Sequence, residues 1–131
     1  ILGYNAVLAE HKASGQKMVV VDSGKKKVLT TDDIKASDAE DRIKAAINKI
    51  KYQSAAIEEF HVTERGTMKS YGQEVPYVRF RAKLKKLPIG EIGGVISVVK
   101  DENGNDKILV SANEKDKYSQ LITNEFFKAV K

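Results

Sequence analysis

The feature that most constrains the fold is a two-residue alternation that runs from Val75 to Lys85. Apolar side chains occupy one set of positions, and aromatic or basic side chains occupy the other. The apolar set is Val78, Phe80, Ala82 and Leu84, and the other set is Tyr77, Arg79, Arg81, Lys83 and Lys85. A period of two places successive side chains on opposite faces of a strand. The segment is therefore predicted to be an antiparallel strand with one face in the core and one in solvent.

A second alternating segment precedes this strand. Residues 57–65 place Phe60 and Val62 on an apolar side, and the two glycines of residues 66–73 indicate a turn before Val75. The two segments are therefore predicted to be adjacent antiparallel strands.

Two further hairpins are predicted on either side of this pair. Residues 95–99 and residues 108–110 are apolar runs, and the Asn103-Gly104 pair between them suits a tight turn. Toward the N-terminus, residues 18–30 carry two apolar runs around a Ser-Gly pair, which predicts a hairpin with that pair at its tip.

Helical patterns occur in three places. Residues 37–52 begin with a capping-box pattern, in which Ser37 is followed three residues later by Glu40, and continue with an apolar stripe. Residues 113–130 carry a second apolar stripe, and residues 1–14 follow a looser spacing of the same kind. Because the consecutive strands are segregated from the helices, the pattern predicts an α+β fold.

The length of 131 residues is typical of one domain, and no linker or internal repeat divides the chain. We predict a single α+β domain over residues 1–131, built on a curved antiparallel sheet of four to six strands. Two or three helices are expected to pack on one face of this sheet. A cone-shaped roll of the cystatin or NTF2-like kind is the architecture that this order of elements favours.

The polar face of the alternating strand carries the one dense charge cluster in the chain. No acidic residue occurs between Val75 and Gly90, whereas the net charge of +5 is otherwise spread along the sequence. Side chains on one strand face recur every ~6.6–6.8 Å, which is close to the phosphate spacing of a nucleic-acid strand. We predict an anionic-partner site formed by Tyr77, Arg79, Arg81, Lys83, Lys85 and Lys86. The alternative is that these side chains coat a solvated sheet face.

Groups that could perform catalysis are sparse. His11 and His61 are the two histidines, and Glu59, His61 and Thr63 share one strand face as the only arrangement that resembles an oriented base. Cysteine is absent, and no phosphate-binding loop occurs. We therefore expect no catalytic site and no cofactor, and the protein is not expected to be an enzyme.

One acidic segment resembles the start of a calcium loop. Asp101, Asn103 and Asn105 supply oxygens at alternate positions, but Gly104 falls at the fourth position and Ala112 at the twelfth. An alanine cannot supply the bidentate carboxylate that such a loop requires. The segment is therefore predicted to be a turn, and no metal site is expected.

The N-terminal residues allow two interpretations. The chain starts at Ile1, and its first eight residues carry no charge. They fit either the first turns of a helix or the remainder of a removed signal or membrane anchor. The second interpretation slightly favours an extracytoplasmic or membrane-anchored setting. No apolar run approaches the ~20 residues that a membrane span needs.

Two resemblances accompany these patterns. Residues 18–24, followed by a helix, resemble the entry of membrane-anchored assembly domains of bacterial conjugation systems, which have NTF2-like or cystatin-like folds. The order of strand, helix, three or more strands and helix is also similar to that of ribosome-hibernation factors, although their RNA-contacting residues have no match here. Neither resemblance is taken as family membership.

Three functions follow from these observations. The first is a non-enzymatic binding or assembly domain that recognises a protein partner, as the soluble part of a membrane-anchored or secreted bacterial protein. The second is a nucleic-acid-binding module that uses residues 77–86. The third is a cone-shaped small-molecule-binding domain, which an apolar pocket lined by Ile43, Ile47 and Phe60 would favour. The oligomeric state is not predicted.

Overall fold

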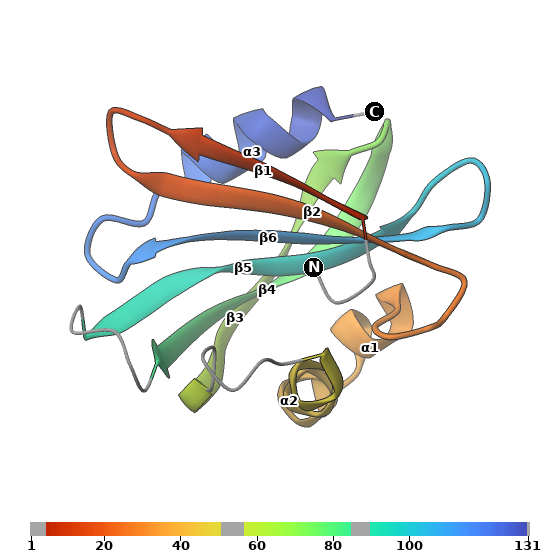
Figure 1. The fold of residues 1–131 in the computed structure, drawn as a ribbon, viewed down its shortest axis with the longest axis horizontal. Helices are drawn as coiled ribbons and strands as arrows, with labels where there is room; N and C mark the ends of the chain where they lie inside the picture. The colour runs from red at the N-terminus through yellow and green to blue at the C-terminus, as the bar shows by residue number, and fades with distance from the viewer. Residues whose placement is uncertain (1–4, 51–56, 85–89, 131) are drawn as a thin grey trace.

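A computed structural model of the protein describes residues 5–50, 57–84 and 90–130. Six strands form one open antiparallel sheet in the order β1-β2-β6-β5-β4-β3 (Figure 1). The strands are β1 (Asn5–His11), β2 (Gln16–Gly24), β3 (Ile57–Ser70), β4 (Gln73–Leu84), β5 (Glu91–Lys100) and β6 (Asp106–Glu114). The α+β class and the antiparallel sheet are therefore confirmed, and β1 and β3 are the two edge strands.

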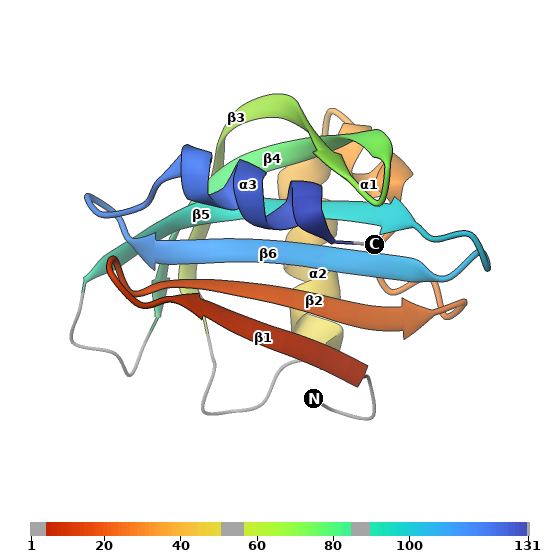
Figure 2. The same cartoon turned by 90° about the horizontal axis from the view of Figure 1, so that it is seen from above.

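The helices lie on both faces of the sheet. They are α1 (Thr31–Lys35), α2 (Ala39–Ile50) and α3 (Gln120–Ala129). Figure 2 shows α3 in front of the sheet and α2 behind it. α1 and α2 thus share one face, whereas α3, which was expected on the same face as α2, covers the opposite one.

Two cores result from this arrangement, because a strand covered on both sides buries its successive side chains in different layers. The core beneath α1 and α2 contains Leu29, Ile34, Ala39, Ile43, Ala46, Phe60, Val78, Phe80, Ala82, Ile96, Val98 and Ile108. The core beneath α3 contains Met18, Val20, Met68, Val75, Val95, Val99, Leu109 and Phe127. The alternation of β4 is confirmed, since Val78, Phe80 and Ala82 all belong to the first core.

The N-terminal segment is a strand, so the predicted helix within residues 1–14 is wrong over its described part. Residues 5–11 pair with β2 along their whole length, and residues 1–4 lie outside the described residues. The turn after β1 closes where the Gly15 N–H donates to the carbonyl of His11 at 2.7 Å, with φ of 79° at Gly15. A short apolar run fits helix and strand equally well, and here pairing with β2 decides.

The hairpin predicted over residues 18–30 is also wrong. Ser23 and Gly24 are the last residues of β2, whose partners are β1 and β6. Thr30 instead caps α1, because its side chain accepts from the backbone N–H of Asp33 while the Asp33 carboxylate accepts from that of Thr30. Leu29 is consequently buried in the core rather than paired in the sheet.

The turn predicted over residues 66–73 is shorter than expected. β3 continues to Ser70, and the turn consists of Tyr71 and Gly72, with φ of 54° and 69°. Positive φ at both positions is the geometry of a two-residue hairpin loop that matches the twist of the strands.

The first residues of β5 and α3 also differ from the prediction. β5 begins at Glu91, so Gly93 and Gly94 lie within the strand instead of before it. α3 begins at Gln120 rather than near residue 113, because β6 extends to Glu114 and the side chain of Ser119 caps the helix.

Candidate functional site

The candidate anionic-partner site lies on the α3 side of β4. Arg81 and Lys83 are exposed there, and Arg79 is half-buried. Tyr77 packs at the margin of the core beneath α3. Lys85 and Lys86 lie outside the described residues.

Neighbouring strands bring acidic side chains to this face. The Arg79 guanidinium lies 3.8 Å from the Glu64 carboxylate, and Arg81 Nε lies 3.1 Å from Glu91 Oε2. Each described cation of the site therefore has an acid beside it, in the pairs Arg79 with Glu64, Arg81 with Glu91, and Lys83 with Glu59 across the strand. The acid-free run in the sequence did not reveal these neighbours. The acids lie on β3 and β5, and the strand register places them beside the cations of β4. The charge of the described part of this face is close to balanced.

The two aromatic side chains near these cations are engaged in packing. The Tyr77 ring lies over Gly66, where a β-carbon would come within 2.5 Å of the Tyr77 hydroxyl oxygen. The Arg79 guanidinium lies 5.2 Å from the centre of the Tyr118 ring, an aromatic neighbour that the sequence did not predict. Burial raises the pKa of Tyr118 to about 12, against the opposing effects of a hydrogen bond with Thr123 and the charge of Arg79. Neither ring is presented freely for stacking on a base.

The arrangement of Glu59, His61 and Thr63 that was considered for catalysis places a cation directly across the strand from the imidazole. His61 is exposed and lies directly opposite Arg81, so its cross-strand neighbour is a guanidinium instead of a carboxylate. The register shifts between Val62 and Glu64, which makes Thr63 the extra residue of a bulge.

The acidic turn between β5 and β6 is held by its own side chain. Asp101 Oδ1 accepts the backbone N–H groups of Asn103 and Asn105, each at 2.9 Å. The predicted turn is thus confirmed. Across the described ranges, no group of three or more histidine, aspartate or glutamate side chains is arranged to hold a metal ion.

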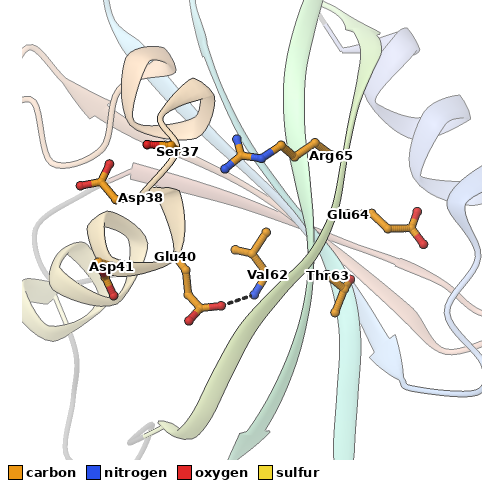
Figure 3. A pocket seen from close by; sticks show the side chains of 8 residues that line it. All are labelled: Ser37, Asp38, Glu40, Asp41, Val62, Thr63, Glu64 and Arg65. Atoms are coloured by element: carbon orange, nitrogen blue, oxygen red, sulfur yellow. Dashed lines mark hydrogen bonds between the residues drawn. The ribbon is translucent and has the colours of Figure 1, made fainter.

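A polar groove runs between the start of α2 and β3 (Figure 3). Glu40 Oε1 accepts the backbone N–H of Val62 at 2.8 Å, so this carboxylate does not turn back toward Ser37 as the capping-box pattern predicted. On the other side of the groove, Arg65 donates to the carbonyls of Ile34 and Ala36 at 3.0 Å and 2.7 Å. These contacts fasten α1 and α2 to the outer edge of β3.

We expect the Glu40 contact to make stability depend on pH. The hydrogen bond from Val62 lowers the pKa of Glu40 below its ordinary value of 4.5, with burial opposing. The stabilisation from this hydrogen bond is therefore complete when the pH lies above the ordinary pKa of Glu40. It is lost as the pH falls through the lower pKa that Glu40 has in the folded protein. Because the carboxylate is partly exposed, Glu40→Gln should lower the free energy of unfolding by about 1 kcal/mol or less at about pH 7.

Urea unfolding at about pH 7 and about pH 3 would measure this difference. The gap between wild type and Glu40→Gln should close at the lower pH, whereas Glu102→Gln, in the exposed turn, should leave stability unchanged at both. An equal gap at both pH values would contradict the assignment.

An apolar cavity separates α2 from the sheet. Its volume is about 270 Å³, and every described residue of its wall is apolar. The wall residues are Val21, Val28, Leu29, Ile43, Ala46, Ile47, Phe60, Phe80, Ala82, Ile92, Ile96, Ile108, Val110 and Ala112. Ile43, Ile47 and Phe60 are among them, which is the observation that would favour a small-molecule-binding domain.

Three alanines contribute small side chains to this wall. Ala46 faces the cavity from α2, and Ala82 and Ala112 face it from β4 and β6. The Phe80 ring stacks on Phe60, with ring centres 5.2 Å apart, and reaches over Gly94. Because several wall residues, Ala112 among them, are only partly buried, the cavity communicates with solvent.

The wall determines which ligands the cavity can accept. The described part of the wall offers no charge, donor or acceptor, so a polar group placed against it would lose its hydrogen bonds to water without replacement. An apolar cavity of about 150 Å³ binds benzene or xenon, so the larger volume here suits a ligand of one or two rings or a short alkyl chain.

The sequence matches no protein-family model, and no curated protein sequence is significantly similar to it. Among the described helices, none combines the length and the hydropathy needed to cross a membrane.

Proposed function

We propose that the protein is a non-enzymatic binding domain that holds a small apolar ligand in the cavity between α2 and the sheet. The observation that carries this proposal is a cavity of about 270 Å³ that reaches solvent and whose described wall residues are all apolar. Ligand pockets are typically concave, mostly apolar and preformed. Among the residues that the structure describes, the wall bears no nucleophile or titratable group, which supports binding rather than catalysis.

We also propose that the architecture is a roll of the cystatin or NTF2-like kind. A curved sheet that bends around a helix leaves a cone-shaped space, and folds of that kind can host carriers. The support here is that α2 and the sheet enclose such a space.

Recognition of a protein partner and binding of an anionic partner stay predictions. The first is supported by the exposed apolar residues of β1, which are Val7 and Leu8. The second has weaker support, because the described cations of the β4 site are balanced by acids. Steep loss of RNA affinity with rising salt concentration would still favour the nucleic-acid interpretation.

Ala112→Leu should weaken ligand binding without unfolding the protein. Ala112 lies at the partly buried margin of the cavity, so replacing its methyl group by an isobutyl group fills space that is empty in the wild type. Filling a cavity commonly stabilises a protein by about 0.5–2 kcal/mol. We expect toluene and naphthalene to raise the Tm of the wild type, because a ligand that binds the folded state stabilises it.

The matched control is Ala129→Leu, which makes the same substitution at an exposed position near the end of α3. Affinity for naphthalene should fall by about tenfold or more in Ala112→Leu and stay unchanged in Ala129→Leu. Benzoate should bind far more weakly than toluene, since the cavity has no partner for a carboxylate. Equal affinity of all three proteins, or preference for benzoate, would contradict the proposal.

A further inference from the structure

The two edge strands of the sheet, β3 and β1, differ in how their outer edges are covered. At the β3 edge, Glu40 accepts the Val62 N–H, Arg65 holds the end of α1, and a bulge interrupts the strand. Such devices prevent another strand from adding to an edge. Within the part of the chain that the structure describes, no backbone hydrogen bond and no helix covers the outer edge of β1.

The open edge is also apolar. Val7 and Leu8 are 64% and 70% exposed, and they lie on opposite faces of the sheet because they are consecutive in a strand. On the α2 face, Leu8 continues a row that crosses the sheet through Val19, Val110 and Ile96. A strand added beside β1 would extend this row and cover Leu8.

We propose that β1 pairs antiparallel with β1 of a second copy of this chain, centred on Leu8, to form a continuous twelve-stranded sheet. A two-fold axis perpendicular to the sheet keeps like faces together, and a symmetric interface uses the same patch on both subunits. With Leu8 opposite Leu8, the whole of β1 finds a partner. The opposed pairs are Leu8 with Leu8, Val7 with Ala9, Ala6 with Glu10, and Asn5 with His11.

The charges of β1 are compatible with this register. Glu10 is the acidic residue of the strand, and it forms an ion pair with Lys17 of β2 in the same subunit. The pairing places Glu10 opposite Ala6 of the second copy, so no two like charges oppose each other, a juxtaposition that would destabilise a strand pair. The central residues of β1 in the second copy are also apolar, so they cover Val7 on one face of the sheet and Leu8 on the other.

Sedimentation velocity of the whole chain at about 100 µM tests this proposal, since a dimer with a Kd of ~10 µM is then mostly associated. The wild type should sediment as a dimer. Leu8→Lys should weaken association by about tenfold or more, because the two-fold axis introduces the change twice. Leu121→Lys, which replaces an equally exposed leucine of α3, should leave the dimer intact.

The absence of cysteine in this chain makes a second readout clean. Directly opposed residues in an antiparallel pair have β-carbons about 4.5–5.5 Å apart, close to the disulfide range. Leu8→Cys should therefore form a cross-linked dimer under a mild thiol oxidant, and Leu121→Cys should not. A monomeric wild type at this concentration, a dimer unaffected by Leu8→Lys, or association only with a different protein would overturn the proposal.

Discussion

Gly94→Ala should destabilise the protein by about 3 kcal/mol or more, the upper part of the range for an overpacked core. A β-carbon at Gly94 would lie 2.1 Å from the carbonyl oxygen of Ser111 and 2.9 Å from the Phe80 ring. The first contact is to backbone, so no change of side-chain rotamer relieves it. β5 and β6 would have to separate where Phe80 forms part of the cavity wall.

Gly93→Ala provides the matched control one residue earlier in the same strand. A β-carbon there would meet its nearest atom at 3.7 Å, which is ordinary van der Waals contact. The change should be neutral or stabilise by about 0.4–1 kcal/mol, because alanine restricts the unfolded chain. Urea unfolding of the three proteins would compare them, and equal stabilities of the two variants would show that the close approach at Gly94 is wrong.

Gln16→Leu should lower the free energy of unfolding by about 2–4 kcal/mol, because it leaves buried polar groups without partners. The Gln16 side chain is fully buried between β2 and α3. Its Nε2 lies 2.9 Å from Ser111 Oγ, and its Oε1 accepts the backbone N–H of Ser119 at 2.9 Å. One side chain thus joins the start of α3 to the sheet, while Phe127 packs the other end of the helix.

The effect of Gln16→Leu should be concentrated in α3. Amide hydrogen exchange should accelerate in residues 120–129 more than in the β5–β6 hairpin, since local opening follows the loss of local contacts. The control is Gln73→Leu, because Gln73 is exposed and its side chain donates a hydrogen bond to the Lys100 carbonyl at 2.9 Å, away from α3. A loss of less than 1 kcal/mol, or exchange that rises evenly over the chain, would disprove the anchoring role of Gln16.

The parts of the fold that the sequence predicted correctly depend on patterns local to one element. The alternation of β4, the Asp101 turn and the stripe of α2 each arise from residues within a few positions of one another. The errors occur where distant pairing decides. The N-terminal run forms β1 because β2 lies beside it, and Ser23 and Gly24 end a strand because β2 pairs with β1 and β6 instead of with residues 25–30.

The candidate sites likewise contain features that follow from one element and features that depend on distant pairing. The packing of Ile43 and Ile47 against the sheet could be predicted, because an amphipathic helix must pack its stripe on the apolar face of a sheet. The acids beside Arg79 and Arg81 could not, because they come from other strands and depend on a register that a bulge shifts by one residue. The same holds for Glu40, whose partner Val62 lies on a strand beyond the helix.

Intermolecular NOEs between naphthalene and the protein test the central claim, occupation of the cavity, most directly. Ile43 of α2 and Ile96 of β5 face the cavity from opposite walls. We expect NOEs from the ligand to the methyl groups of both residues and none to Leu121, which is 67% exposed on α3. NOEs to Leu121 or to the exposed Val7, with none to Ile43 and Ile96, would show that the apolar ligand binds the surface and that the cavity is not its site.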